Sequence, residues 1–217
     1  MKKTLYSLTL SDEVIREIDM LAHRKGTNRS NLVNQILAEY VNLRTPEQRV
    51  GDIFSAIEEL MSATQIIPQV TEGAPSMALR SCLEYKYRPS VRYEVELMPA
   101  VKNSQIGNLS VVFRTQSSAL LGVLADFFRL WSKIEQKYLP FETHYLLDDG
   151  RFTRTLSCPT SNGSEKTGLS AKELARIISD YIRLFDKLLK AYVAGTMTPD
   201  EIAAEYAADL KSRTILI

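Results

Sequence analysis

The chain has 217 residues, of which 45% are hydrophobic and 24% are charged, and its formal net charge is +1. These values are typical of an ordinary folded protein and argue against a disordered chain or a broadly basic nucleic-acid coat. No apolar run approaches the roughly 20 residues of a membrane-spanning helix, so we expect no membrane association. The two cysteines are far apart in no paired motif, which favours a reduced cytoplasm.

The first 41 residues predict one strand and two amphipathic helices. Polar and apolar residues alternate over 4–10, which is typical of a strand. Ser11 is a suitable N-cap for a helix that ends at Gly26, and Asn28 caps a second helix that reaches about residue 41. The apolar stripes comprise Val14, Ile15, Ile18, Leu21 and Ala22 in the first helix and Leu32, Val33, Ile36, Leu37, Tyr40 and Val41 in the second. So small a unit buries too little apolar surface to fold alone, and we expect a dimer with paired strands and four intertwined helices.

The combination of these lengths, caps and stripes resembles the ribbon-helix-helix family of DNA-binding proteins, of the MetJ/Arc type. The matching residues are Leu8-Thr9-Leu10-Ser11, then Val14, Ile18 and Leu21, then Gly26-Thr27-Asn28-Arg29-Ser30, and the stripe from Leu32 to Tyr40. The resemblance covers residues 1–45, about the first fifth of the chain. It implies an obligate homodimer that inserts a two-stranded antiparallel ribbon into the major groove of double-stranded DNA.

Strand alternation indicates which side chains of the ribbon would meet DNA. Tyr6, Leu8 and Leu10 continue the helix stripes and should face the core. The resemblance then implies base contacts from Lys3, Leu5, Ser7 and Thr9. Ser7 and Thr9 are shorter than the side chains usual in the family, and Leu5 offers only an apolar contact. The alternative interpretation is a degenerate dimerisation module whose outward strand residues are merely exposed to solvent.

The N-terminus of the second helix is the other expected contact. Its free N–H groups and dipole suit a phosphate, and Asn28, Arg29 and Ser30 stand there. Asn28 and Ser30 are ordinary capping residues in any case, so phosphate binding would be an added use.

A second domain is predicted over residues 46–217. Thr45-Pro46 favours a new helix, which Pro68 is expected to end. The following pattern predicts strands at 76–87, 91–97 and 105–114, a helix at 118–138, strands at 141–147 and 152–158 around an Asp148-Asp149-Gly150 turn, and two helices that begin after Ser170 and Thr198. This order indicates an α+β domain whose antiparallel sheet is covered by helices on one face.

The apolar stripes at 53–60, 120–138 and 174–192, together with the tail at 215–217, exceed what one dry sheet face can obviously cover. We therefore expect residues 46–217 to self-associate, and we expect this domain to serve oligomerisation, effector sensing or partner binding.

No catalytic, metal or cofactor motif is recognisable. His23 and His144 lack the neighbours of a metal cluster and are expected to be surface or packing residues. Four strand tyrosines could line a ligand pocket but are more often core residues, namely Tyr85, Tyr87, Tyr93 and Tyr145.

The sequence thus favours a non-enzymatic, sequence-specific DNA-binding transcriptional regulator of a bacterial or archaeal nucleoid. It would act as a homodimer or higher oligomer and respond to a small-molecule or protein effector. The alternative is a DNA-organising plasmid partition or conjugation accessory protein whose second domain recruits a protein partner.

Overall fold

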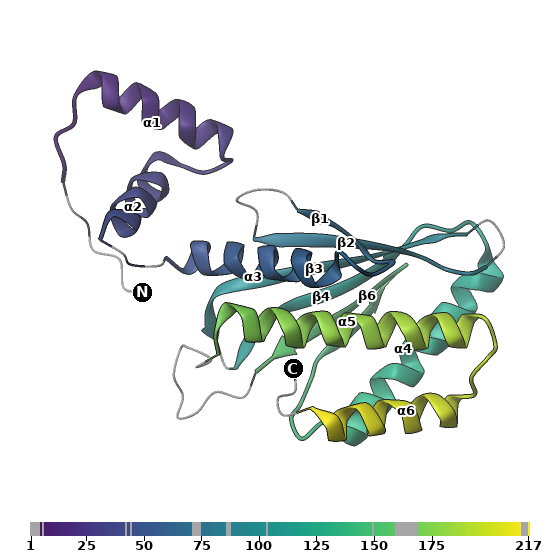
Figure 1. Cartoon of the computed structure of the whole chain (residues 1–217). Coiled ribbons are helices and arrows are strands. Elements are labelled where there is room, and N and C mark those ends of the chain that lie inside the picture. The colour runs from purple at the N-terminus through teal and green to yellow at the C-terminus, as the bar shows by residue number, and fades with distance from the viewer. Residues whose placement is uncertain are drawn as a thin grey trace.

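The computed structural model describes residues 5, 7–41, 43, 45–70, 75–85, 88–102, 104–148, 150–158, 169–213 and 217. Within them it contains six helices and six strands (Figure 1). In chain order these are α1 (Asp12–Arg24), α2 (Arg29–Tyr40), α3 (Pro46–Met61), β1 (Ile67–Val70), β2 (Ser76–Cys82), β3 (Ser90–Lys102), β4 (Gln105–Phe113), α4 (Ser118–Tyr138), β5 (Tyr145–Asp148), β6 (Arg151–Ser157), α5 (Ala171–Val193) and α6 (Pro199–Ser212). The predicted α+β class with an antiparallel sheet is confirmed.

The six strands form one antiparallel sheet in the order β1-β2-β3-β4-β6-β5. Tyr93 in the middle of β3 lies opposite Leu79 on β2 and Val111 on β4. These three residues are fully buried, whereas Arg92, which precedes Tyr93 on β3, is exposed. The alternation gives the sheet one apolar face and one polar face.

The polar face carries a small charge network, and no helix within the described residues covers it. On it, Glu94 pairs with Arg92 at 3.2 Å and with Arg151 of β6 at 3.1 Å. All three side chains are partly exposed, so these pairs contribute little to stability.

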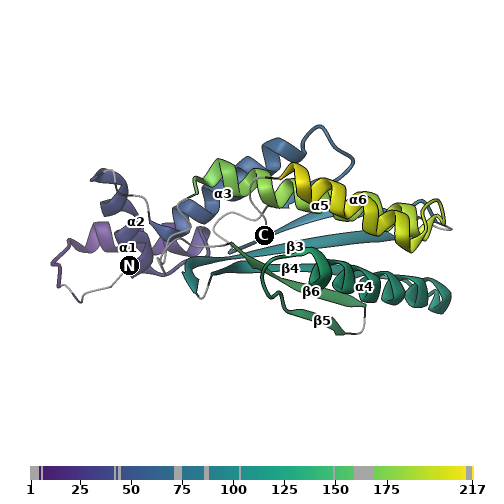
Figure 2. The same cartoon turned by 90° about the horizontal axis from the view of Figure 1, so that it is seen from below.

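The apolar face packs against α3, α4 and α5, and α6 lies against α4 and α5 (Figures 1 and 2). Phe185 of α5 is the centre of an aromatic cluster between the helices and the sheet. Its ring lies 4.8 Å from that of Trp131 on α4 and 6.1 Å from that of Tyr93 on β3. Phe128 of α4 stacks on Phe152 of β6 with ring centroids 4.6 Å apart. These aromatic contacts therefore join α4 and α5 to the strands β3 and β6.

A charged pair lies inside this layer. Arg154 of β6 points into the apolar side and donates from Nε to Glu135 of α4 at 2.9 Å, and both side chains are fully buried. Its guanidinium also donates to a main-chain oxygen of Ile217 and lies 4.5 Å from the ring of Tyr181. Burial acts to lower the pKa of Arg154, but the Glu135 carboxylate outweighs it and holds that pKa above its ordinary value. Tyr206 of α6 donates to Glu135 at 3.2 Å, so the pair ties four elements together.

The capping residues in the second half of the sequence correctly predicted where α5 and α6 begin. Ser170 and Glu173 form the predicted capping box at the start of α5, and Thr198 caps α6 with Pro199 at its first position. Gly195, just after the end of α5, adopts the left-handed conformation typical of a helix-ending glycine, with φ of 68°.

Several predicted boundaries were wrong because sheet pairing overrode local signals. The helix predicted to reach Pro68 ends at Met61, and β1, which was not predicted, runs through Pro68 at the sheet edge, where a missing N–H is tolerated. The strand predicted over 76–87 ends at Cys82. β3 continues through Pro99, where its register with β4 shifts between Leu97 and Lys102. The strand predicted from residue 141 begins only at Tyr145.

The long apolar stripes are covered within the chain. The buried core includes Ile53 and Ile57 of α3, the inward residues of α4 and α5, and Ile217. The sequence-based reason for self-association of residues 46–217 was therefore wrong, because three helices share one strongly packed sheet face. Only scattered large apolar side chains of this part are exposed among the described residues, namely Ile67, Tyr85, Val123, Leu146 and Leu147.

Candidate DNA interface

The α1–α2 hairpin is formed by the local signals that its sequence predicts. Ser11 accepts a hydrogen bond from the Val14 N–H at 3.5 Å and so caps α1. Gly26 lies between the helices with φ of 61°, which a side chain would disfavour. Asn28 caps α2 by accepting from the Asn31 N–H at 2.9 Å. The hairpin thus places Asn28, Arg29 and Ser30 at the positive end of the α2 dipole.

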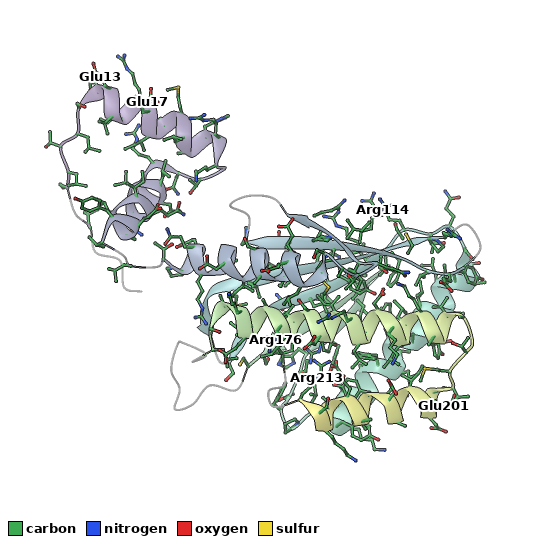
Figure 3. All side chains as sticks on the ribbon, in the orientation of Figure 1. Glu13, Glu17, Arg114, Arg176, Glu201 and Arg213 are labelled. Carbon is green, nitrogen blue, oxygen red and sulfur yellow. The ribbon has the colours of Figure 1, made fainter. Side chains whose placement is uncertain are left out.

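The core of the hairpin is small and separate from that of the sheet. Its buried residues are Ile18, Ala22 and Leu32, against which Leu21 and Val33 pack. Glu13 and Glu17 project from the side of α1 turned away from α2 (Figure 3). Ile18 and Ala22 therefore face α2, whereas Glu13 and Glu17 face away from it.

Much of the apolar surface of this segment has no cover within one chain. Ile36 is 44% exposed and Leu5 is 98% exposed. Large apolar residues more than a third exposed are Leu5, Leu8, Leu10, Val14, Met20, Ile36, Leu37, Tyr40, Val41 and Leu43. Such a concentration is unusual for a surface that meets only water.

The predicted base-contacting residues that the structure describes, Leu5, Ser7 and Thr9, are not part of a strand in the single chain. No strand is assigned to the described residues 5 and 7–11, and Leu5, Ser7 and Thr9 are exposed. Lys3 and Tyr6 lie outside the described residues. Leu8 and Leu10 are exposed too, so the predicted inward and outward faces stay a prediction that depends on a second copy.

Arg29 forms an ion pair that was not predicted from the sequence. Its Nε donates to Asp19 Oδ1 at 2.7 Å and its Nη2 donates to Asp19 Oδ2. This side-chain hydrogen bonding lowers the pKa of Asp19 below its ordinary value. Arg29 is therefore not an unpaired cation, and a phosphate would share it with Asp19 through the Nη1 N–H groups. Asp19 and Arg29 are ten residues apart on different helices, so no helical spacing signals the pair.

If the start of α2 binds a DNA phosphate, as the resemblance implies, replacing Asp19 by asparagine is expected to raise the affinity for duplex DNA of any sequence about three- to tenfold at low salt, because it removes a carboxylate beside Arg29. Fluorescence anisotropy at several salt concentrations measures this change.

Arg29→Ala should weaken binding to duplex DNA and make the log–log plot of affinity against salt concentration shallower by about one unit.

Glu17→Gln removes a carboxylate from the other side of α1 and is the matched control, with a smaller expected gain than Asp19→Asn. In an Arg29→Ala background, Asp19→Asn should add little beyond that control. An Asp19→Asn affinity at or below that of the unaltered chain would contradict phosphate contact by Arg29.

Other sequence candidates are dispersed over the molecule. His23 and His144 are both exposed, at the end of α1 and just before β5. Tyr93 is a core residue, Tyr85 lies at the rim of a pocket, Tyr145 is half-buried, and Tyr87 lies outside the described residues. The described residues contain no group of three or more His, Cys, Asp or Glu side chains arranged to hold a metal ion. Every helix in the described part of the chain is too short or too polar to cross a membrane.

Comparison with known proteins gives no further assignment, because no family model, curated protein or solved structure matches the chain.

Proposed function

We propose that this protein is a homodimeric, sequence-specific DNA-binding regulator of the ribbon-helix-helix type. The observation that carries the proposal is the uncovered apolar surface of the described residues between 5 and 43, on a hairpin whose core, as far as it is described, consists of the buried Ile18, Ala22 and Leu32. A second copy would cover this surface, and pairing of the two N-terminal strands would satisfy their backbone groups.

In such a dimer the paired strands would enter the major groove, which accommodates a two-stranded ribbon. Ser7 and Thr9 would contact base edges by hydrogen bonds, Leu5 would contact an apolar base edge such as a thymine methyl, and Lys3 would lie beside them. The α2 N-termini, with Asn28, Arg29 and Ser30, would meet the flanking phosphates and set the position of the ribbon.

The larger part of the chain is proposed to sense an effector or partner. Residue 45 caps α3, whose first turn follows the hairpin closely, and α3 packs along α5 over the sheet. A ligand that alters this layer would act on the helix that joins both parts.

The N-terminal strand, rather than a helix, should read the base sequence. Thr9→Ala is expected to reduce the preference for the cognate site over random DNA by about 1 kcal/mol or somewhat more, the value of a single base contact. Thermal stability should change little because Thr9 is exposed. Competition binding with cognate and random duplexes measures the first quantity, and calorimetry measures the second. Loss of the dimer in Thr9→Ala would show that the strand faces are inverted.

The full chain provides a direct test of the whole proposal. Analytical ultracentrifugation should show a dimer, and a duplex selected from random sequence should bind the chain more tightly than bulk DNA does. A monomer at micromolar concentration with no duplex preference would refute the proposal. Genome-wide footprints at scattered promoters would support a regulator, whereas a single clustered array of repeats would indicate partition.

A further inference from the structure

A pocket of about 1050 Å³ lies where three distant segments of the chain meet. The connection between β2 and β3 supplies Glu84, Tyr85 and Arg88, Gln65 follows the end of α3, and Lys190 and Val193 belong to the last turn of α5. This end of the sheet is opposite the end at which α3 meets the hairpin (Figure 1), and α3 alone spans about 24 Å. The pocket is therefore separate from the candidate DNA interface.

Lys190 is held in the pocket wall by a buried carboxylate. Its Nζ lies 2.6 Å from Oδ2 of Asp186, which is only 5% exposed. The other oxygen of Asp186 accepts a hydrogen bond of 2.8 Å from the buried hydroxyl of Tyr93 on β3. The ammonium group has three N–H donors, so the contact with Asp186 leaves donors for another acceptor. The ammonium is thus anchored beside the pocket instead of moving freely in solvent.

Arg88 supplies the second positive charge. Its backbone lies in the left-handed region with φ of 42°, an uncommon conformation for a residue with a side chain. Its backbone N–H donates to the main-chain carbonyl oxygen of Tyr85 at 2.8 Å. Among the described residues, the Arg88 guanidinium has no hydrogen-bond or ion-pair partner. The turn therefore presents a planar set of donors that matches a carboxylate or a phosphate.

The other residues that line the pocket indicate which kind of ligand would fit it. Among the described lining residues the charged groups are Glu84, Arg88 and Lys190. Asp186 already pairs with Lys190, so Arg88 is the lining cation to which the described residues supply no ion-pair partner. Gln65 and Tyr85 add polar groups, and Val193 contributes apolar surface. We infer that this pocket binds a small organic anion, with its carboxylate or phosphate at Arg88 and Lys190 and its apolar part against the end of α5. The inference does not rest on DNA binding, so each proposal can fail without the other.

The test uses the full chain and three probes, namely benzoate, phenyl phosphate and the neutral benzyl alcohol. Each is titrated at constant ionic strength while the backbone amide signals of Leu83, Val193 and Ala194 are followed by NMR. We expect at least one of the two anions to shift these signals saturably, with dissociation constants in the range of about 0.1–5 mM for so small a ligand. Benzyl alcohol should bind at least about tenfold more weakly, because it lacks the charge that meets two cations.

Arg88→Gln is the decisive variant, because Arg88 is exposed and its replacement should leave the fold intact. It should weaken binding of the anion about tenfold or more. Arg80→Gln is the matched control, since Arg80 is exposed on β2 and does not line the pocket, and it should change binding less than twofold.

Binding of benzoate alone would identify a carboxylate site, and binding of phenyl phosphate alone would identify a phosphate site; either result supports the inference. Absence of saturable shifts up to about 20 mM, a range that covers even weak complexes, would overturn it. Equal binding of benzyl alcohol, or equal effects of Arg88→Gln and Arg80→Gln, would overturn it as well.

Discussion

Replacing Ile36 by glutamate is expected to dissociate the proposed dimer and to lower the affinity for duplex DNA at least about 100-fold, which corresponds to about 2.7 kcal/mol. Ile36 is 44% exposed in the single chain and lies on the apolar stripe of α2. In the proposed dimer the new carboxylate would be buried without a partner, which costs several kcal/mol in each of two copies. DNA affinity should fall when the dimer is lost, because the proposed ribbon needs a strand from each copy.

The control for added charge is Asn34→Glu. Asn34 is an exposed polar residue on the same helix, so its replacement introduces the same charge toward DNA without entering the apolar stripe. Sedimentation equilibrium and anisotropy with a labelled duplex measure the two properties. We expect Asn34→Glu to stay dimeric and to lose much less affinity. If Ile36→Glu stays dimeric, the exposed stripe is not the dimer surface and the proposed function loses its main support.

Glu135→Leu is expected to lower the free energy of unfolding by about 3–5 kcal/mol, the usual effect of removing one partner of a buried ion pair. Arg154 and Glu135 are both fully buried, and the leucine would leave the guanidinium charged inside the apolar layer. Tyr206 would also lose the carboxylate that accepts its hydroxyl. Urea unfolding followed by circular dichroism measures the change.

The double variant Glu135→Leu/Arg154→Leu distinguishes the attraction between the two charges from the cost of burying them. Without either charge, most of the loss should be recovered, because the ring of Tyr181 beside Arg154 and the surrounding buried core suit an apolar side chain. Glu58→Leu, which alters an exposed glutamate of α3, should change stability by less than about 0.5 kcal/mol. Equal effects of Glu135→Leu and Glu58→Leu would contradict the buried pair.

Elements with strong end signals were predictable because those signals act within a few residues. Helix α4 begins and ends at the predicted residues, between the cap Ser117 and Pro140. The capping boxes of α5 and α6 and the glycine that ends α1 are likewise interactions over three or four positions. Alternation also identified β3 and β4, since period two is visible in the sequence.

The candidate DNA interface was predictable only in part. Capping and stripes place Asn28, Arg29 and Ser30 at the start of α2. The ion pair of Arg29 with Asp19 depends on how α1 crosses α2, which is a property of the hairpin and not of either helix. The inward and outward faces predicted for the N-terminal segment depend on the proposed pairing with a second copy, which the fold of a single chain does not test.

The sequence by itself determined the helices, their caps, the alternating strands and the α+β class, because each follows from nearest neighbours along the chain. Only the tertiary structure decided the rest. Pairing with β2 made a strand of the segment around Pro68, and the shared sheet face covered the apolar stripes of α3, α4 and α5. Packing also buried Arg154 with Glu135 and brought Arg88 near Lys190, residues about a hundred positions apart. Contacts at such separation form when elements pack, so no local periodicity records them.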